Sequence, residues 1–343
     1  MGMNHFENVV PPEKLEAIKK AVYEVFGTSE VDDCKLLKGG FSNTLIYLFV
    51  IKHKSYVLRV VTSANIVEDV RREHICTQLA SKAGIAPYLY YYNDNAITIT
   101  DFIETVPFQM GFATQQQLLT ELVKTVRAIH SLPLFPKLIN FMDGVDILIK
   151  QFRELRMFPE LITNECFELY GNIQKSYPRY DIDRVSSHND LNPNNLLFDG
   201  NKIWVIDWEM AFESDRYVDL AIIANTFLKE KHHEEIYLTA YFGNKLNDYM
   251  RGRFYLMQQV CHVYYAMLML RFAAEAKPVG FEHSSQMNLP SLPDFHAMIG
   301  KQQVSLETYQ AQLQYGKILI NTAVKNMKDK RFQLAIELIH TLR

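Results

Sequence analysis

The stretch from His188 to Glu209 constrains the fold of this chain more than any other. A polar loop runs into the short apolar run Leu196–Phe198. Asp199-Gly200-Asn201 then carries strong turn chemistry, because Gly and Asn tolerate the positive φ of tight hairpins. Residues 202–207 are β-branched and aromatic, as expected of a second strand. The sequence therefore predicts a polar loop followed by a β-hairpin.

The register of this hairpin brings two polar side chains together. With the turn centred near Gly200 and Asn201, Asn195 and Asp207 lie almost opposite each other, with Cβ atoms about 5 Å apart. That separation lets two oxygen-bearing side chains share one hard divalent cation. Asp190 lies just upstream, on the loop that feeds the hairpin. The pattern His-x-Asp-x-x-x-x-Asn, followed by an Asp on a strand, resembles the catalytic loop and the metal-binding Asp of kinases.

Composition sets wider limits. The chain has 343 residues, enough for two lobes and a large core. Its formal charge of -3 suggests no nucleic-acid or anionic-membrane partner. We find no apolar run long enough to span a membrane and no signal region at the N-terminus. The 4 cysteines are scattered without metal-ligand spacing, which favours free thiols in a reducing compartment, and we expect a cytoplasmic protein.

The sequence predicts consecutive strands over residues 36–61 of the N-terminal part. The first turn carries Gly39-Gly40-Phe41-Ser42-Asn43, where glycines let backbone N–H groups approach phosphate oxygens. In isolation, the two glycines favour an ordinary hairpin turn over a phosphate loop. Arg59 lies on a later strand and needs a partner if it faces inward, edge exposure being the alternative. Glu73, on an expected helix over residues 68–82, resembles the helix partner in the strand–helix ion pair of kinases.

The strand expected over residues 96–100 ends in Asp101-Phe102-Ile103-Glu104, a suitable place for a hinge between two lobes. Backbone groups of a hinge can read an adenine edge, so Asp101 and Ile103 are candidate nucleotide contacts. Beyond residue 115 the pattern becomes helical. We expect helices over residues 118–129, 146–158, 163–177, 215–229 and 249–275, a loop over 276–293, and closing helices over 304–315 and 319–342.

Motifs in order across about residues 36–228 resemble those of the aminoglycoside phosphotransferase and choline kinase superfamily. They are Gly39-Gly40-Phe41-Ser42-Asn43, Val57-Leu58-Arg59-Val60, Glu73, Ile129-His130-Ser131-Leu132-Pro133, His188–Asn195, Ile206-Asp207-Trp208-Glu209 and Asp219-Leu220-Ala221. The resemblance implies an α+β, two-lobed protein-kinase-like fold, with a small antiparallel-sheet N-lobe over residues 1–104 and a larger, mostly helical C-lobe over residues 105–343. It also implies ATP and Mg²⁺ as cofactors.

By the same resemblance, Asp190 is the catalytic base, and Asn195 and Asp207 are Mg²⁺ ligands. Arg59 and Glu73 position phosphate, and residues 39–43 form the phosphate loop. Asp219 either supports the catalytic loop or is simply an acid at a helix N-terminus. The expected activity is transfer of the γ-phosphate of ATP to a hydroxyl of a small molecule, in a monomer or homodimer without membrane insertion.

The acceptor is less defined. Arg59, where aminoglycoside kinases usually carry Lys, and the sequences His-Asn-Asp and Ile-Asp-Trp-Glu resemble bacterial choline kinases. Choline kinases cage their cation with tryptophans on late helices, whereas both tryptophans here, Trp204 and Trp208, lie in the hairpin. Candidate substrate residues are Asn192, Glu209, Tyr255, His262 and Tyr265. The alternatives are an aminoglycoside, aminosugar or thiamine kinase, a catalytically silent nucleotide-binding scaffold, and a protein kinase, which the missing Asp-Phe-Gly and Ala-Pro-Glu disfavour.

Overall fold

The computed structural model describes residues 5–37, 44–61, 67–93, 97–180 and 183–342. The chain folds into two compact units. Unit 1 consists of Met1–Pro136 and Val185–Glu213, and unit 2 consists of Lys137–Arg184 and Ser214–Arg343. The hairpin of the predicted site thus belongs to the same unit as the N-terminal strands. The lobe boundary expected at residue 104 stays a prediction.

Unit 1 is built on a five-stranded antiparallel sheet in the order β1-β2-β3-β5-β4. Its strands are β1 (Asp33–Leu37), β2 (Thr44–Ile51), β3 (Lys54–Val61), β4 (Leu89–Tyr92) and β5 (Ile97–Asp101). The predicted consecutive strands over residues 36–61 are therefore confirmed. Together with the mostly helical unit 2, this sheet confirms the predicted α+β class.

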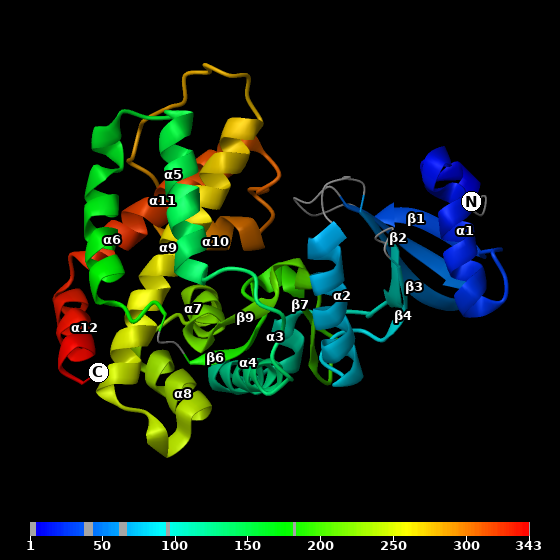
Figure 1. Ribbon diagram of the computed structural model, residues 1–343, viewed down its shortest axis with the longest axis horizontal. Helices are drawn as coiled ribbons and strands as arrows, with labels where there is room; N and C mark the ends of the chain where they lie inside the picture. The colour runs from blue at the N-terminus through cyan, green and yellow to red at the C-terminus, as the bar shows by residue number, and fades with distance from the viewer. Residues whose placement is uncertain (1–4, 38–43, 62–66, 94–96, 181–182, 343) are drawn as a thin grey trace. The chain divides into compact units, whose positions relative to one another are not determined.

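One face of this sheet is covered by helix α1 (Pro12–Phe26), which ends at Gly27 in the left-handed conformation (φ 70°) (Figure 1). Alternate β3 side chains, among them Leu58 and Val60, enter the core that α1 closes. Because neighbouring side chains of a strand point to opposite faces, Arg59 faces away from this core. β3 is an interior strand, so edge exposure of Arg59 is wrong.

The remaining elements of unit 1 carry the candidate site. They are α2 (Val67–Lys82), α3 (Phe108–Gly111), α4 (Gln115–His130), β6 (Arg184–Ser187), η3 (Pro193–Asn195), β7 (Leu196–Phe198), β8 (Ile203–Val205), η4 (Trp208–Met210) and β9 (Phe212–Asp215). β7 and β8 form the predicted hairpin. The first residue of β6, Arg184, and the last two residues of β9, Ser214 and Asp215, belong to unit 2. Thr114 and Gln117 form a capping box that starts α4.

The segment that leaves the sheet after β5 is fastened to the hairpin. Val106 N–H donates to Phe198 O over 2.8 Å. The Phe108 and Phe112 rings lie 5.9 Å and 4.8 Å from the Phe198 ring, centroid to centroid. Gly111 lies against this ring so closely that a Cβ on it would overlap Phe198. The hairpin is therefore held to the segment that follows the expected hinge by a backbone hydrogen bond and by aromatic packing around Phe198.

We expect Gly111→Ala to destabilise unit 1 by about 1–3 kcal/mol, because overpacking forces either the Phe198 ring or α3 to move. Thermal unfolding followed by circular dichroism measures this. Gly300→Ala is the matched control, since the described structure leaves open space around Gly300 at the end of its helix. Equal melting temperatures for the two variants would contradict the contact.

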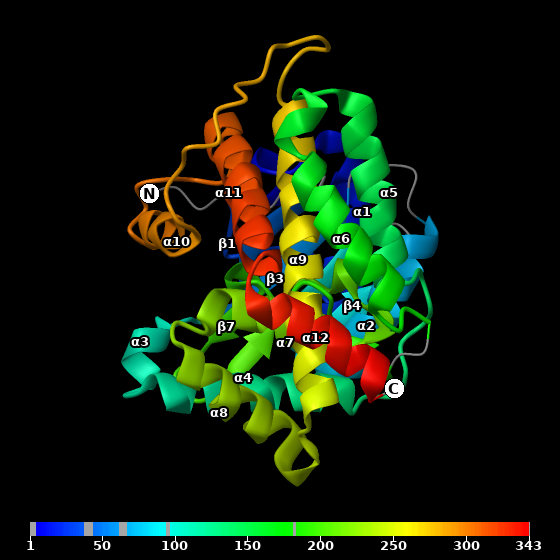
Figure 2. The same cartoon turned by 90° about the vertical axis from the view of Figure 1, so that its left-hand side faces the viewer.

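Unit 2 is a bundle around the long helix α9 (Asp248–Glu275), which packs most extensively against four other helices (Figure 2). These are α5 (Phe141–Leu155), α7 (Arg216–Phe227), α11 (Tyr309–Met327) and α12 (Lys330–Thr341). The unit also contains η2 (Glu160–Ile162), α6 (Asn164–Ser176), α8 (Lys231–Phe242), η5 (Gly243–Lys245) and α10 (Leu292–Gly300). None of the helices in the described part of the chain has the length and apolar character that crossing a membrane requires.

Several helix boundaries differ from those expected. α5 begins at Phe141 because the Asn140 side chain caps it, accepting from Met142 N–H. α10 begins at the end of the expected loop and continues to Gly300, where no helix was expected; it is capped by Ser291, which accepts from Asp294 N–H. The closing helices break at Lys328–Asp329, and the first runs to Met327. The predictions for the long helix α9 and for α6 and α7 are confirmed to within about two residues.

Candidate active site

The hairpin forms where turn chemistry placed it. The Asp199 carboxylate accepts from the N–H groups of Asn201 (2.8 Å) and Lys202 (2.9 Å), and Gly200 takes a φ of 96°. Leu196 pairs with Val205 and Phe198 with Ile203. Ile206 N–H donates to Asn195 O, so Asp207 lies one residue beyond the position directly opposite Asn195.

The loop before the hairpin is anchored by two buried side chains. His188 Nε2 is hydrogen-bonded to Ile206 O at 3.0 Å, and its ring packs against Trp208 with centroids 4.8 Å apart. Asn189 adopts a left-handed conformation (φ 61°) and donates from Nδ2 to Met210 O at 3.0 Å. Both residues are fully buried. The loop is therefore fixed to the strand that precedes Asp207 and to the turn that follows it.

These anchors place Asp190 beside two asparagines. Asp190 Oδ2 accepts from Asn192 Nδ2 at 3.1 Å and from Asn195 Nδ2 at 2.9 Å. Asn192 also starts η3, because its Oδ1 accepts from Asn194 N–H. The candidate base and one candidate metal ligand, Asn195, are thus in direct contact. Asn192, a candidate substrate residue, contacts Asp190 in the same way.

Arg59 forms an ion pair with Glu73 of α2, as the sequence predicts. Its Nη2 atom also lies 3.3 Å from Glu209 Oε2 and 3.6 Å from Asp207 Oδ1. The exposed fractions of the side chains rise from Glu73 (11%) and Arg59 (17%) to Asp207 (36%) and Glu209 (42%). The Arg59 guanidinium therefore connects its own strand, β3, to helix α2 and to the segment after the hairpin through ion pairs.

We expect Arg59→Met to raise the KM for ATP and to destabilise unit 1 by about 3 kcal/mol, because Glu73 is left mostly buried without its cation. The double variant Arg59→Met/Glu73→Leu removes both charges. It is expected to regain stability without regaining ATP affinity. Thermal unfolding and the KM for ATP, measured on both variants, test this. A wild-type KM in the double variant would contradict a phosphate-positioning role for Arg59.

The donor set near Arg59 suits a magnesium ion. Asp207 Oδ1 is buried and has no hydrogen-bond partner among the described residues, and Asp207 holds a left-handed backbone (φ 63°). The Asn195 amide donates to Asp190 through Nδ2, which leaves its oxygen as the atom for a metal. Mg²⁺ is usually held by one or two carboxylates together with phosphates rather than by a full protein cage. Within the described ranges, no group of three or more His, Cys, Asp or Glu side chains is placed to hold a metal ion.

The other candidate nucleotide contacts divide into two groups. The expected phosphate loop, Gly39, Gly40, Phe41, Ser42 and Asn43, lies outside the described residues. In the expected hinge, the Asp101 carboxylate accepts from Lys54 Nζ (2.8 Å) and from the Tyr90 hydroxyl (3.0 Å). Ile103 is partly buried just beyond β5. The Asp101 side chain thus stabilises the sheet, which is consistent with a nucleotide contact through backbone atoms.

The candidate substrate residues of α9 belong to unit 2. The Tyr255 hydroxyl donates to Asn326 O at 2.8 Å, and the Arg331 guanidinium lies 4.2 Å above its ring. His262 is buried, and burial, with a smaller effect of His296, lowers the pKa of His262 to about 3. Tyr265 is partly buried against the Tyr264 ring. Tyr255 therefore already has a cation partner from this chain, and His262 is neutral at physiological pH.

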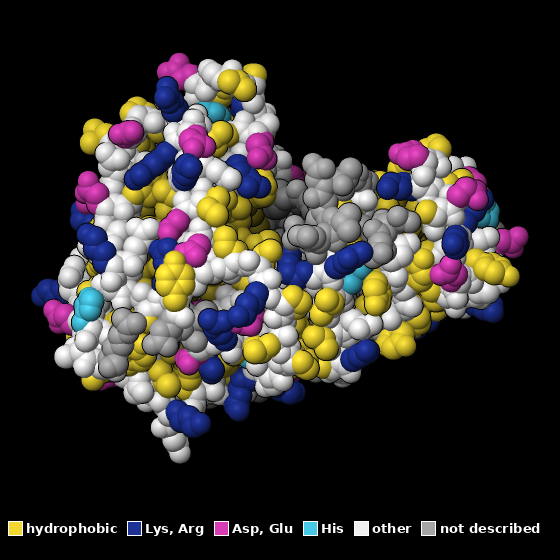
Figure 3. Space-filling model, viewed as in Figure 1, with side chains coloured by type: hydrophobic (Ala, Val, Ile, Leu, Met, Phe, Trp, Pro, Cys, Tyr) yellow, Lys and Arg dark blue, Asp and Glu magenta, His cyan; other side chains and the backbone are white. Residues whose placement is uncertain are grey.

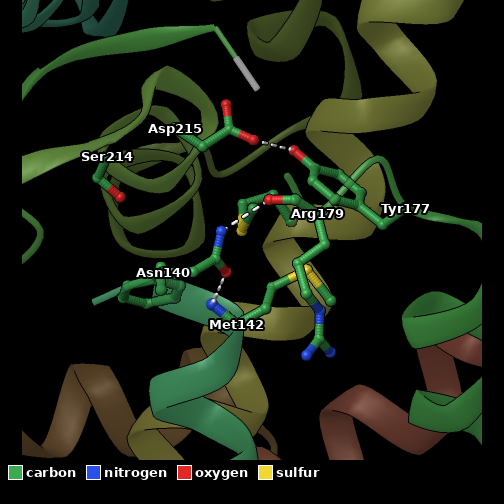
Figure 4. Close-up of a pocket in the computed structure, with 8 residues that line it drawn as sticks. Asn140, Met142, Tyr177, Arg179, Ser214 and Asp215 are labelled. Atoms are coloured by element: carbon green, nitrogen blue, oxygen red, sulfur yellow. Dashed lines mark hydrogen bonds between the residues drawn. The ribbon is translucent and has the colours of Figure 1, made fainter. Parts of the chain in front are cut away.

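A small cavity in unit 2 is lined by Asn140, Tyr177, Arg179 and Asp215, among others (Figure 4). Its volume is about 10 Å³, room for one water molecule. The Tyr177 hydroxyl donates to Asp215 at 2.7 Å, and Arg253 pairs with the same carboxylate at 2.8 Å. The cavity is therefore part of the packing of unit 2 and is too small for an organic acceptor.

On the face seen in Figure 3, acidic and basic side chains are interspersed, in keeping with the small net charge.

A model of the phosphotransferase enzyme family matches residues 33–255, which include every residue of unit 1 named above as a candidate. The chain belongs to this family. The match confirms the predicted superfamily and the predicted enzyme class, a phosphotransferase. Among curated proteins, the LicA homolog of Mycoplasma capricolum subsp. capricolum is 37% identical over 54 residues. This match spans 16% of the chain and 23% of that relative.

Three solved structures are similar in fold over 88–94% of this chain. A choline/ethanolamine kinase family protein from Mesorhizobium loti has a TM-score of 0.69 at 17% identity, covering 94% of this chain and 98% of its own. The choline kinase LicA from Streptococcus pneumoniae has a TM-score of 0.61 at 17% identity, covering 92% and 99%. A streptomycin–ATP ternary complex of APH(2")-IIa has a TM-score of 0.59 at 15% identity, covering 88% and 98%. These likenesses confirm the predicted fold.

Proposed function

We propose that this phosphotransferase transfers the γ-phosphate of ATP to a hydroxyl of a small, cationic molecule, and that an amino alcohol of the choline or ethanolamine kind is the preferred acceptor. The observation that carries the proposal is the convergence in unit 1 of the Arg59–Glu73 ion pair, the buried Asp207 Oδ1 and the Asp190–Asn195 contact. Phosphoryl transfer needs these parts: a cation on the nucleotide phosphates, oxygen ligands for a metal, and a base.

Each residue has a distinct task in this proposal. Arg59, held by Glu73, binds and orients the nucleotide phosphates. Asp207 and Asn195 would hold Mg²⁺, which neutralises charge on the phosphates when bound. Asp190 orients the acceptor hydroxyl and accepts its proton, while Asn192 and Asn195 keep the carboxylate in place. The protein contributes positioning and electrostatic stabilisation, because this reaction asks little covalent chemistry of it.

The preferred acceptor is inferred from the negative charge of the site and from the similarity to solved structures. Glu209 and Asp190 give the site carboxylates that suit an ammonium group, and Glu209 is partly exposed. The solved structures with the higher TM-scores above are described as a choline/ethanolamine kinase family protein and a choline kinase. An aminoglycoside or other aminosugar is the second candidate, supported by the likeness to the streptomycin complex. Tyr255, His262 and Tyr265 remain candidate acceptor contacts.

ADP release, measured with ATP and Mg²⁺ across a panel of choline, ethanolamine, thiamine, aminosugars and aminoglycosides, tests the proposal. We expect the fastest acceptor-dependent release with choline or ethanolamine. Faster release with an aminoglycoside would support the second candidate instead. Nucleotide binding without acceptor-dependent ADP release would indicate a silent scaffold, and labelling of a peptide would overturn the small-molecule assignment.

A further inference from the structure

Helix α2 carries a second buried charge next to Glu73. Arg72 is 8% exposed and Glu73 is 9% exposed, so the helix buries two adjacent charged residues. Glu73 pairs with Arg59, whereas Arg72 reaches the segment that follows Asp207. Its Nη2 atom donates to Glu209 O at 2.6 Å, and its Nη1 atom donates to Ala211 O. A planar guanidinium can bind two acceptors at once in a fixed geometry, which a lysine cannot.

The same segment is bound from its other side by the loop of Asp190. Asn189 Nδ2 donates to Met210 O at 3.0 Å and lies 3.4 Å from Phe212 O. Successive carbonyl groups therefore alternate between two partners. Those of residues 209 and 211 go to Arg72, and those of residues 210 and 212 go to Asn189. The backbone after Asp207 is held between α2 and the candidate catalytic loop.

This arrangement bears on two acidic side chains. Asp207 adopts a left-handed backbone (φ 63°), which is strained for a residue other than glycine and persists only where the surroundings enforce it. Glu209, whose carbonyl oxygen binds Arg72, directs its carboxylate to Arg59. Since Arg72 and Glu73 are neighbours on one helix, the position of Arg59 and the position of the Asp207–Glu209 turn are set by the same helical turn.

We propose that Arg72 is a positioning residue, which fixes Asp207 and Glu209 relative to Arg59 and so sets the affinity for the metal–nucleotide complex. This inference rests on the proposed function. Arg72 acts through the backbone, since its guanidinium donates to the carbonyl groups of Glu209 and Ala211. Residues that orient metal ligands in this way typically change metal affinity or activity about 10- to 100-fold when replaced.

Arg72→Met tests the inference, because it keeps the length of the side chain and removes the donors. Arg71→Met is the matched control: Arg71 is the exposed neighbour on the same helix. We expect Arg72→Met to weaken Mg·ADP binding, measured by calorimetry, about tenfold or more. Hydrogen exchange of the peptide covering residues 208–212 is expected to accelerate. Arg71→Met should change neither quantity.

Rescue experiments distinguish a positioning role of Arg72 from a contribution to the overall stability of the protein. Arg72→Ala with millimolar guanidinium ion is expected to regain Mg·ADP affinity, and Arg72→Lys to regain part of it through a single donor group. If Arg72→Met fails to fold, Arg72→Lys provides the same comparison. Wild-type Mg·ADP affinity in folded Arg72→Met, or in folded Arg72→Ala without guanidinium ion, would overturn the inference, whatever the melting temperature. Because this readout needs no acceptor, failure of every acceptor in the panel would count against the proposed function and leave the test of Arg72 intact.

Discussion

Asp190→Asn is expected to lower kcat by roughly 10²–10⁴-fold, the usual contribution of a general base, while the affinity for Mg·ADP stays within about twofold of wild type. The amide oxygen of the new side chain still accepts from Asn192 and Asn195, so the loop keeps its shape. What is lost is the group that takes the acceptor proton. Steady-state ADP release with the preferred acceptor gives kcat, and calorimetry gives the nucleotide affinity.

Two further variants make this test specific. Glu168→Gln removes an exposed carboxylate from α6 and is expected to have wild-type kcat. Asp190→Ala also removes the acceptor for the two asparagine amides, so it is expected to weaken Mg·ADP binding where Asp190→Asn does not. Undiminished turnover in Asp190→Asn would defeat the assignment of Asp190 as the base.

Asp207→Asn is expected to lower kcat by roughly 10²–10³-fold and to raise the Mg²⁺ concentration needed for half-maximal activity, because a metal ion contributes several kcal/mol of charge stabilisation. The substitution keeps the size of the side chain and removes its negative charge. Binding of Mg·ADP is expected to weaken in parallel. Titration of activity and of nucleotide binding with MgCl₂ measures both effects.

The matched control lies on the same hairpin. Asp199→Asn removes a carboxylate that accepts from two backbone N–H groups and from Trp204 Nε1 at 2.8 Å. We expect it to lower the melting temperature while the Mg²⁺ requirement stays unchanged. If Asp207→Asn saturates at the same Mg²⁺ concentration as the wild type, Asp207 does not bind the metal.

The parts of the fold that sequence predicts well are those set by local chemistry. The turn at Asp199 fixes the register of β7 and β8, because its side chain binds its own backbone and Gly200 supplies the positive φ. The Arg59–Glu73 pair was expected from its place on a strand and the following helix, and the structure confirms the contact. Apolar periodicity predicted α9, whose long buried face leaves little ambiguity.

The parts that escape prediction depend on backbone partners or on distant contacts. Arg72 reads in sequence as an ordinary helix cation, because the carbonyl groups of Glu209 and Ala211 leave no mark on residue identity. Asn189 is hidden in the same way. The start of α10 did have a signal, Ser291 followed by Pro293 and Asp294, but several prolines nearby favoured a loop. The register of a hairpin can be predicted because neighbouring residues determine it. The hydrogen-bond partner of a backbone carbonyl group cannot, because the tertiary fold determines it.

The surroundings of Arg59 have a consequence for which form of the nucleotide this protein accepts. One guanidinium lies within ion-pair distance of three carboxylates, those of Glu73, Asp207 and Glu209, so the cluster carries an excess of negative charge. A nucleotide without a bound metal is a polyanion, so its electrostatic interaction with this cluster is repulsive overall. A divalent ion bound to the phosphates makes that interaction attractive. We therefore expect free nucleotide, in excess over the metal, to compete poorly with the metal-bound form.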